Sequence, residues 1–195
     1  MVSQGITYLC MADAEFSRRL SFAFLEDVKN RISDLGVIYL SKENETVLRK
    51  TIDDLQLRFV PLFSAKPHVF LWKEHPLAQR DGLKLADLQP FPRLNFVQGS
   101  YESAYYSEEL FSTVPSPKQI RINDRGAIVN FMVGLNAYTI SSGIFPRYLH
   151  GDNIIAVPLL EEEAMHIGYV INEKQELNEL GRIYVDELLK YAPRA

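Results

Sequence analysis

The strongest constraint in this 195-residue sequence is the alternation of short apolar runs with longer amphipathic segments. Residues 34–40 are almost wholly apolar, which is typical of a strand buried on both faces of a sheet. The segment 44–55 then places apolar residues on one side of a helix and charged residues on the other. Strands separated by helices are typical of βαβ units. The sequence therefore predicts an α/β fold with mostly parallel sheets and helices on both faces.

The rest of the chain continues this alternation. Segment 74–92 is rich in turn formers and polar residues, which indicates that the chain passes there from one lobe to another. We expect strands at 5–11, 57–63, 68–72, 94–97, 138–141, 153–159 and 166–171, and helices that begin at Asp13, at Asn123 or Asp124, and near Leu177.

Composition restricts the partners and the compartment. The chain has 25 acidic and 21 basic residues, and a net charge of −4 argues against a nucleic-acid-binding module on its own. The single cysteine, Cys10, excludes an intramolecular disulfide, and a reducing, cytoplasmic location is the expectation. No signal peptide and no stretch near the roughly 18 apolar residues of a membrane span are visible.

Motifs that carry chemistry are missing from the sequence. The four histidines, at 68, 75, 150 and 166, form no close pair of the kind that binds a metal. The motifs GxSxG, GxGxxG and GxxxxGK[ST] are absent. The acidic run 161–163 is interpreted as a solvated surface. We therefore expect no catalytic residue, no metal and no cofactor, and the chain is predicted not to be an enzyme.

Polar loops beside glycines follow several predicted strands. In open α/β sheets small ligands bind outside the carboxyl ends of the strands, where helix N-termini offer free N–H groups. For each loop alone, an ordinary turn or helix cap is the alternative interpretation. Together these loops give the candidate ligand-binding residues Ser3, Gln4, Gln98, Gly99, Ser100, Asn123 and Ser141.

Six segments in order resemble the effector-binding domain of LysR-type transcriptional regulators. The resemblance covers about residues 28–193, and the step HPLA followed by LKLADL is its most specific part. The matching segments are Ser33–Ile38, Val69–Ala78, Leu83–Leu88, Val133–Ile140 with Gly143–Pro146, Ile155–Leu159 and Ile167–Ile171.

This resemblance implies a two-lobed fold like that of periplasmic binding proteins of the second type. Lobe I would be residues 1–72 plus 166–195, and lobe II residues 73–165. The crossings between lobes would fall near 68–72 and 166–171, which should then lie side by side. The resemblance also implies a homodimer and a small-molecule effector between the lobes. Carboxylates are common among the ligands of this fold family, and amino acids, aromatic acids and neutral metabolites are open alternatives. DNA would be bound only through a winged helix-turn-helix domain that is absent from this sequence.

The front of the chain departs from that pattern. Residues 5–32 resemble part of the longin domain of R-SNARE proteins, through Tyr8–Asp13, Phe16 and Phe22–Arg31. The regulators usually place two strands and two helices before the segment matching Ser33–Ile38, and about 30 residues leave room for roughly one of each. The chain is therefore either a natural regulator with a truncated lobe I or a hybrid joined near residues 27–33.

The leading hypothesis is a ligand-sensing and dimerisation domain of a transcription regulator, which does no chemistry itself. A solute-binding protein and an enzyme acting on a small acid are alternatives on the same fold. A trafficking or designed interaction protein is a further alternative, which rests only on the first 32 residues.

Overall fold

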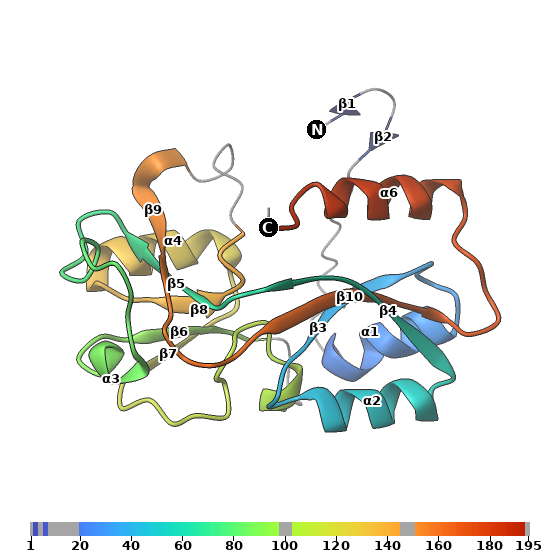
Figure 1. Ribbon diagram of the computed structural model, residues 1–195, viewed down its shortest axis with the longest axis horizontal. Helices are drawn as coiled ribbons and strands as arrows, with labels where there is room; N and C mark the ends of the chain where they lie inside the picture. Colours follow the sequence, from blue (N-terminus) through green and yellow to red (C-terminus); the bar gives the residue numbers. More distant parts are fainter. Residues whose placement is uncertain (1, 4–5, 8–19, 98–102, 145–150, 194–195) are drawn as a thin grey trace.

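A computed structural model describes residues 2–3, 6–7, 20–97, 103–144 and 151–193 (Figure 1). The chain forms two sheets with helices packed on their faces, and the predicted α/β class is confirmed. Two strands at the front, β1 (Val2–Ser3) and β2 (Ile6–Thr7), form a separate hairpin and pair only with each other. In Figure 1 this hairpin lies beyond the C-terminal helix, away from both sheets.

The first sheet has the strand order β3 (Gly36–Leu40), β10 (Met165–Asn172), β4 (Leu57–Ala65). Both outer strands are antiparallel to β10, so β3 and β4 run in the same direction. Helix α2 (Glu45–Asp54) connects β3 to β4 in the manner of a βαβ unit. Strand β10 comes from the far end of the chain and inserts between them.

Helices cover both faces of this sheet. Helix α1 (Leu20–Lys29) and α2 lie on one face, where Val28, Ile52 and Val170 are buried in a common apolar cluster. Helix α6 (Glu179–Leu189) lies over the opposite face (Figure 1). The expectation of helices on both faces is met here.

The second sheet contains β8 (Thr139–Ser141), β5 (His68–Trp72) and β9 (Ile154–Pro158) in that order, all pairs antiparallel. Strands β6 (Arg93–Phe96) and β7 (Gln119–Ile122) form a parallel pair beside it. Backbone contacts join this pair to the rest of the sheet. The Leu94 N–H donates to the Tyr138 carbonyl over 2.7 Å, and Arg93 and Tyr138 form a parallel β-bridge. The combined order is therefore β7, β6, β8, β5, β9.

Short helices complete this part of the chain. They are α3 (Leu85–Leu88), the 3₁₀ turns η2 (Ala104–Tyr106) and η3 (Gly151–Asn153), and α4 (Arg125–Leu135), which connects β7 to β8. The parallel direction of β6, β7 and β8 places their carboxyl ends at one edge of the sheet.

The expectation of mostly parallel sheets is wrong, since most described strand pairs are antiparallel. Helical crossovers do give parallel directions, as between β3 and β4 and between β7 and β8. However, β10 separates β3 from β4, and β5 separates β8 from β9, each running the opposite way. These intervening strands are paired with segments distant in sequence, which a pattern of neighbouring elements does not reveal.

The crossings between the sheets also differ from the prediction. Residues 166–171 pair with β4 and β3, not with 68–72, whose partner is β9. The chain changes sheets at Lys66 and Pro67, where proline lacks the N–H that a continued ladder needs. The chain returns to the first sheet between β9 and β10. In that connection the Leu159 N–H donates to the Pro67 carbonyl over 3.0 Å. The two crossings thus lie side by side, a few residues earlier than predicted in both segments.

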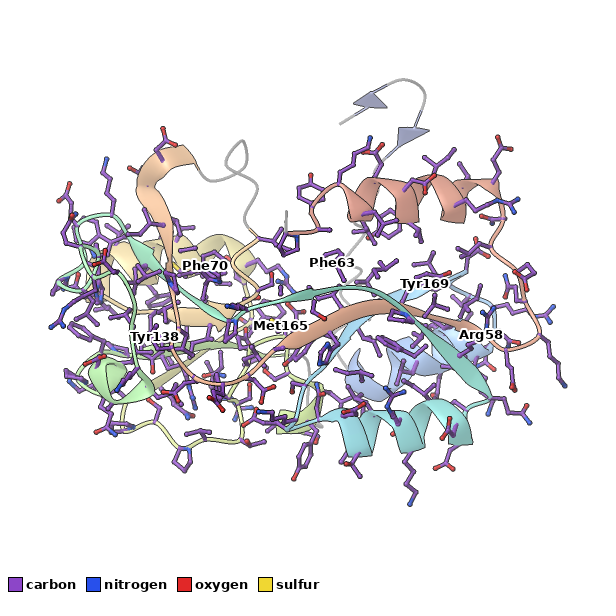
Figure 2. All side chains as sticks on the ribbon, viewed as in Figure 1. Arg58, Phe63, Phe70, Tyr138, Met165 and Tyr169 are labelled. Atoms are coloured by element: carbon purple, nitrogen blue, oxygen red, sulfur yellow. The ribbon has the colours of Figure 1, made fainter. Side chains whose placement is uncertain are left out.

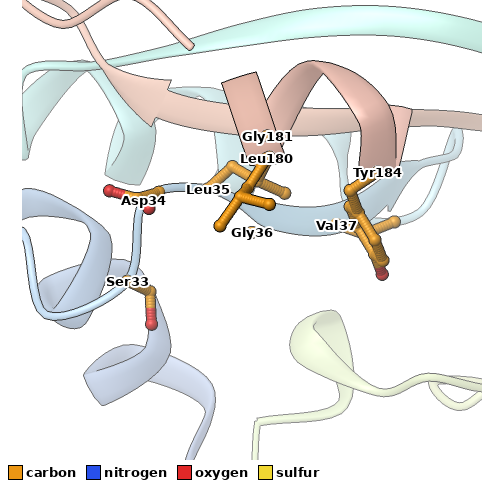
Figure 3. Close-up of a pocket in the computed structure, with 8 residues that line it drawn as sticks. All are labelled: Ser33, Asp34, Leu35, Gly36, Val37, Leu180, Gly181 and Tyr184. Carbon is orange, nitrogen blue, oxygen red and sulfur yellow. The ribbon is translucent and has the colours of Figure 1, made fainter. Parts of the chain in front are cut away.

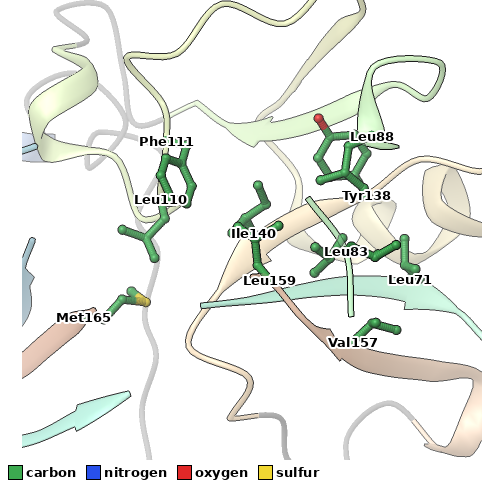
Figure 4. Packing of buried hydrophobic residues seen from close by; sticks show 11 residues of the cluster. Leu71, Leu83, Leu88, Leu110, Phe111, Tyr138, Ile140, Val157, Leu159 and Met165 are labelled. Atoms are coloured by element: carbon green, nitrogen blue, oxygen red, sulfur yellow. The ribbon is translucent and has the colours of Figure 1, made fainter. Parts of the chain in front are cut away.

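The largest apolar cluster packs against the second sheet and reaches the first sheet at Met165 (Figure 4). Strand β5 divides its side chains between two faces: Val69 and Leu71 enter this cluster, while Phe70 enters another against α4. Met165, the first residue of β10, joins the same cluster as Tyr138 of the second sheet. Figure 2 shows Met165 at this junction. The core therefore ties both sheets together.

Candidate functional site

The candidate site is built on the carboxyl ends of three parallel strands in the second sheet. Asn123 follows β7 directly and is exposed, and Ser141 ends β8 and is half-buried. In this sheet β6 lies between β7 and β8. The segment 98–100 follows β6 in the sequence. The strand directions therefore support one common edge for the three predicted loops.

The other candidate residues fall in different places. Ser3 lies in β1, opposite Ile6, so the structure does not bring it to the edge that carries Asn123 and Ser141. Gln4, Gln98, Gly99 and Ser100 lie outside the described residues.

The helix that starts beside Asn123 is capped by its neighbour. The Asp124 carboxylate accepts a hydrogen bond from the Gly126 N–H at 2.9 Å, which satisfies a donor of the first turn of α4. The sequence left Asn123 and Asp124 as alternative caps, and the structure assigns this role to Asp124. The Asn123 side chain is thus not the N-cap of α4.

Arg125 supplies the positive charge at this edge, and the sequence interpretation missed it. Its guanidinium lies over the Phe96 ring, 4.2 Å from the centroid, and pairs with the Glu108 carboxylate. Phe96 is the last residue of β6, so Arg125 lies close to two of the three strand ends. The sequence did contain a signal for this residue, because Arg125 is a basic residue in the first turn of a helix that follows a polar loop. A carboxylate ligand here would compete with Glu108 for the guanidinium.

A polar contact zone joins the first sheet to the segment 106–113. The Tyr39 hydroxyl, at the end of β3, contacts the carbonyl oxygens of Ser107 at 2.9 Å and Glu109 at 3.2 Å. The hydroxyls of Thr51 and Tyr106 share a hydrogen bond of 2.7 Å. These contacts connect β3 and α2 to a loop of the second sheet, so they fix how the two parts meet.

The same segment is held from its other side by Arg93 of β6. The buried Arg93 guanidinium donates to the carbonyl oxygens of Phe111 at 2.9 Å and Val114 at 2.6 Å. Burial lowers the pKa of Arg93, partly offset by the nearby Tyr138, Glu43 and Glu109. Because Arg93 anchors the segment to β6, the Tyr39 contact is made to a fixed partner.

Glu109 is the buried acid of this zone. Its carboxylate accepts hydrogen bonds from the Phe96 N–H at 3.0 Å and the Ser107 hydroxyl at 2.7 Å. Burial raises the pKa of Glu109, while those two hydrogen bonds lower it in part. The carboxylate therefore links the segment to the end of β6, next to the candidate site.

Two buried side-chain oxygens near the strand ends have no hydrogen-bond partner in the part of the chain that the structure describes. They are the Ser41 hydroxyl, directly after β3, and the Asn95 carbonyl in β6. Ser41 is 2% exposed. Sequence reasoning did not select it, although it follows a predicted strand.

A separate groove lies between the start of β3 and α6 (Figure 3). Its volume is about 490 Å³. Ser33, Asp34 and Val37 line one side, and Leu180 and Tyr184 of α6 line the other. This groove lies on the first sheet and contains none of the candidate ligand residues.

Two further searches cover only the described ranges. Those residues contain no group of three or more His, Cys, Asp or Glu side chains that could hold a metal ion. None of their helices combines the length and the apolar character needed to cross a membrane.

Comparison with solved structures shows which fold this is. The effector-binding domain of QuiR in complex with shikimate matches at a TM-score of 0.54 and 18% identity, over 89% of this chain and 78% of that one. HinK, a LysR family transcriptional regulator from Pseudomonas aeruginosa, matches with a TM-score of 0.58 and 15% sequence identity. This match covers 86% of this chain and 56% of HinK. The C-terminal domain of a probable LysR family transcriptional regulator from Rhodococcus sp. RHA1 matches with a TM-score of 0.56 and 18% sequence identity. This match covers 86% of this chain and 79% of that domain.

The fold is thus that of effector-binding domains of LysR-type regulators. The two-lobed architecture that the sequence resemblance implied agrees with these neighbours.

The first 34 residues carry a different similarity. They match the model of the Longin family, described as a regulated-SNARE-like domain. Over 35 residues the chain is 60% identical to Vesicle-associated membrane protein 7B of Dictyostelium discoideum, which is 18% of this chain and 14% of that protein. The chain therefore combines a longin-like front with a regulator-like remainder, as the hybrid interpretation predicts.

Proposed function

We propose that this chain is an effector-binding module that takes a small carboxylate between two lobes and responds by changing the angle between them. The observation that carries the proposal is the fold shared with effector-binding domains of regulators, one of them in complex with shikimate. The proposed lobes follow the sequence expectation except that β5 is assigned to lobe II, because it pairs with β8 and β9, so lobe I is residues 1–67 plus 165–195 and lobe II is residues 68–164. An alternative function on the same fold is a solute-binding protein.

The proposed ligand site lies in lobe II at the edge described above. Gln98, Gly99 and Ser100 follow β6, Asn123 follows β7 and Ser141 ends β8. Gln4 stays a proposed contact from lobe I, whereas Ser3 is not proposed, since it lies in the hairpin that pairs only with itself. Arg125 adds a cation beside Asn123, which favours an anionic ligand over a neutral one.

The proposed partners follow from the same fold. The module acts as a homodimer in the cytoplasm, and the family resemblance implies that DNA is bound through a winged helix-turn-helix domain. It uses no cofactor and catalyses no reaction.

A thermal-shift panel followed by calorimetric titration tests this function. The panel contains small carboxylic acids, among them shikimate and benzoate, and the matching neutral amides. We expect at least one acid to raise the unfolding temperature while its amide does not. Ser100→Ala, Asn123→Ala and Ser141→Ala should each weaken binding of that acid by about 1.5 to 3 kcal/mol.

Asn130→Ala is the matched control, because Asn130 is exposed and lies within α4, away from the strand ends. It should leave affinity unchanged. A panel without any stabilising acid, or equal affinity in all three site variants and the control, would contradict the proposal.

A further inference from the structure

An ion pair occupies the edge of the second sheet where the proposed effector site lies. Arg125, the first residue of α4, pairs through its guanidinium with the Glu108 carboxylate, and the two side chains are 60% and 44% exposed. The guanidinium lies over the Phe96 ring, 4.2 Å from its centroid. Because Phe96 ends β6 and Asn123 follows β7, the pair lies at the ends of two neighbouring parallel strands. This edge therefore offers a ligand a cation and an anion side by side, both within reach from solvent.

Acidic groups surround this guanidinium. Asp124 immediately precedes Arg125 in the chain. Glu109, the residue after Glu108, is buried, and its carboxylate accepts a hydrogen bond from the Phe96 N–H at 3.0 Å. Burial raises the pKa of Glu109, and the charge of Glu108 raises it further, so the two carboxylates repel each other. A ligand that carries only negative charge is therefore repelled here as well as attracted.

We propose that the effector is an α-amino acid, whose carboxylate binds Arg125 and whose ammonium group binds Glu108. A single carbon atom separates these two groups in an α-amino acid, so they can reach a guanidinium and a carboxylate that are already in contact. An acid without the ammonium group would compete with Glu108 and leave two carboxylates facing each other. The zwitterion adds one charge of each sign, so both charged groups of the protein keep a partner.

The ion pair can rearrange around such a ligand at little cost. An exposed ion pair contributes little to the stability of a fold, so a change in its contacts leaves the chain folded. The cation–π contact with Phe96 holds the guanidinium in place while Glu108 turns towards the ammonium group. The ligand class rests on the proposed effector function, since an α-amino acid is one kind of small carboxylate, and it goes beyond that function by requiring an ammonium group.

Calorimetric titration of the full chain tests the ligand class. A thermal-shift screen of the standard amino acids first selects the one that stabilises the chain most. This amino acid is then compared with the acid that lacks its ammonium group and with the amine that lacks its carboxylate. For phenylalanine these two compounds are hydrocinnamate and phenethylamine. We expect the amino acid to bind at least about tenfold more tightly than either, because it alone forms both charge-assisted contacts.

Two substitutions test the assigned contacts. Glu108→Gln removes the partner of the ammonium group, so it should weaken binding of the amino acid by about tenfold or more without weakening binding of the matching acid. Arg125→Gln removes the partner of the carboxylate and should weaken binding of both. Glu187→Gln is the matched control, since Glu187 also forms an exposed ion pair, with Lys190, but lies on α6 in lobe I. Its affinity should be unchanged, and thermal unfolding confirms that each variant is folded.

Equal affinity for the amino acid and its matching acid overturns the ligand class. So does a folded Glu108→Gln variant that still prefers the amino acid to the acid, or a simple acid that binds when no amino acid does. These outcomes leave the effector proposal intact, since a small carboxylate still binds. If neither an acid nor an amino acid binds, both proposals fail, so the two failures are distinguishable.

Discussion

At the scale of single residues, the Tyr39 hydroxyl is the contact whose loss is easiest to measure. It serves two carbonyl oxygens of the segment 106–113, those of Ser107 and Glu109. Tyr39→Phe removes the donor to the Ser107 carbonyl, while the Glu109 carbonyl keeps the Ser112 hydroxyl at 2.6 Å, so we expect a loss of about 1 to 2 kcal/mol in the free energy of unfolding. Urea denaturation measures this loss. Tyr105→Phe, at an exposed tyrosine, is the control, and an equal effect of both variants would contradict the assignment.

Glu109 gives stability a pH dependence with a defined sign. Its pKa in the folded chain is above the ordinary value of 4.5, so between these two values the folded chain holds more protons than the unfolded chain. This group therefore makes the free energy of unfolding fall as the pH rises from about 4.5 through the folded-state pKa. Glu109→Gln should lack this contribution.

Urea denaturation of both proteins between pH 4 and 8 checks the prediction. The stability of Glu109→Gln relative to the original chain should increase as the pH rises. Glu176→Gln, at an exposed glutamate, should show a constant difference. A difference that does not vary with pH for Glu109→Gln would show that ionisation of this carboxyl has no energetic cost in the fold.

At the scale of elements, the pairing of β10 with β4 depends on a residue without a side chain. A Cβ at Gly168 would lie 2.4 Å from the Val60 carbonyl oxygen and 2.4 Å from the Phe59 ring. The backbone atom cannot yield without disturbing the strand pair. Gly168→Ala should therefore lower the free energy of unfolding by about 1 to 3 kcal/mol.

Gly134→Ala provides the matched comparison within the same chain. Gly134 lies in α4, and a Cβ there would meet nothing within 4 Å. Alanine in a helix is favoured over glycine, so we expect a gain of about 0.5 to 1 kcal/mol. Chemical denaturation of both variants measures the contrast, and a similar change in both would refute the close approach at Gly168.

Local patterns predicted most elements because each strand and helix carries its own periodicity. The helix predicted at 44–55 is α2, and the strand predicted at 34–40 is β3. The end of the first helix is not visible in the same way: α1 ends at Lys29, although Ile32 continues the apolar spacing of four residues from Val28, and Ile32 is 75% exposed. Leu177 likewise precedes α6. Helix ends depend on capping and on packing against other elements, which four-residue spacing does not contain.

At the scale of the whole molecule, the net charge and the proposed lobes predict how the chain behaves toward DNA. With 25 acidic and 21 basic residues, we expect no measurable binding of duplex DNA at physiological salt. An electrophoretic mobility assay at micromolar protein checks this. A shift that weakens steeply with added salt would contradict it.

The candidate site was partly predictable from local sequence patterns, as most strands and helices were. Asn123 and Ser141 were proposed because polar residues after apolar strands are visible in the sequence, and strand direction places them at one edge; their ligand contacts stay a prediction. Arg125, Glu109 and Tyr39 were missed because their roles depend on contacts across the two sheets. Tertiary pairing of this kind has no local signature.

The most direct test of the central claim, ligand binding between the two parts, is amide hydrogen exchange with and without the acid that binds best in the panel. The account predicts slower exchange in the segments 123–125 and 141–143 of lobe II together with a segment of lobe I. The expected lobe I segment is 41–44, where the buried Ser41 hydroxyl after β3 has no partner among the described residues. Absence of protection, or protection confined to one sheet or to α6, would contradict a ligand held between the lobes.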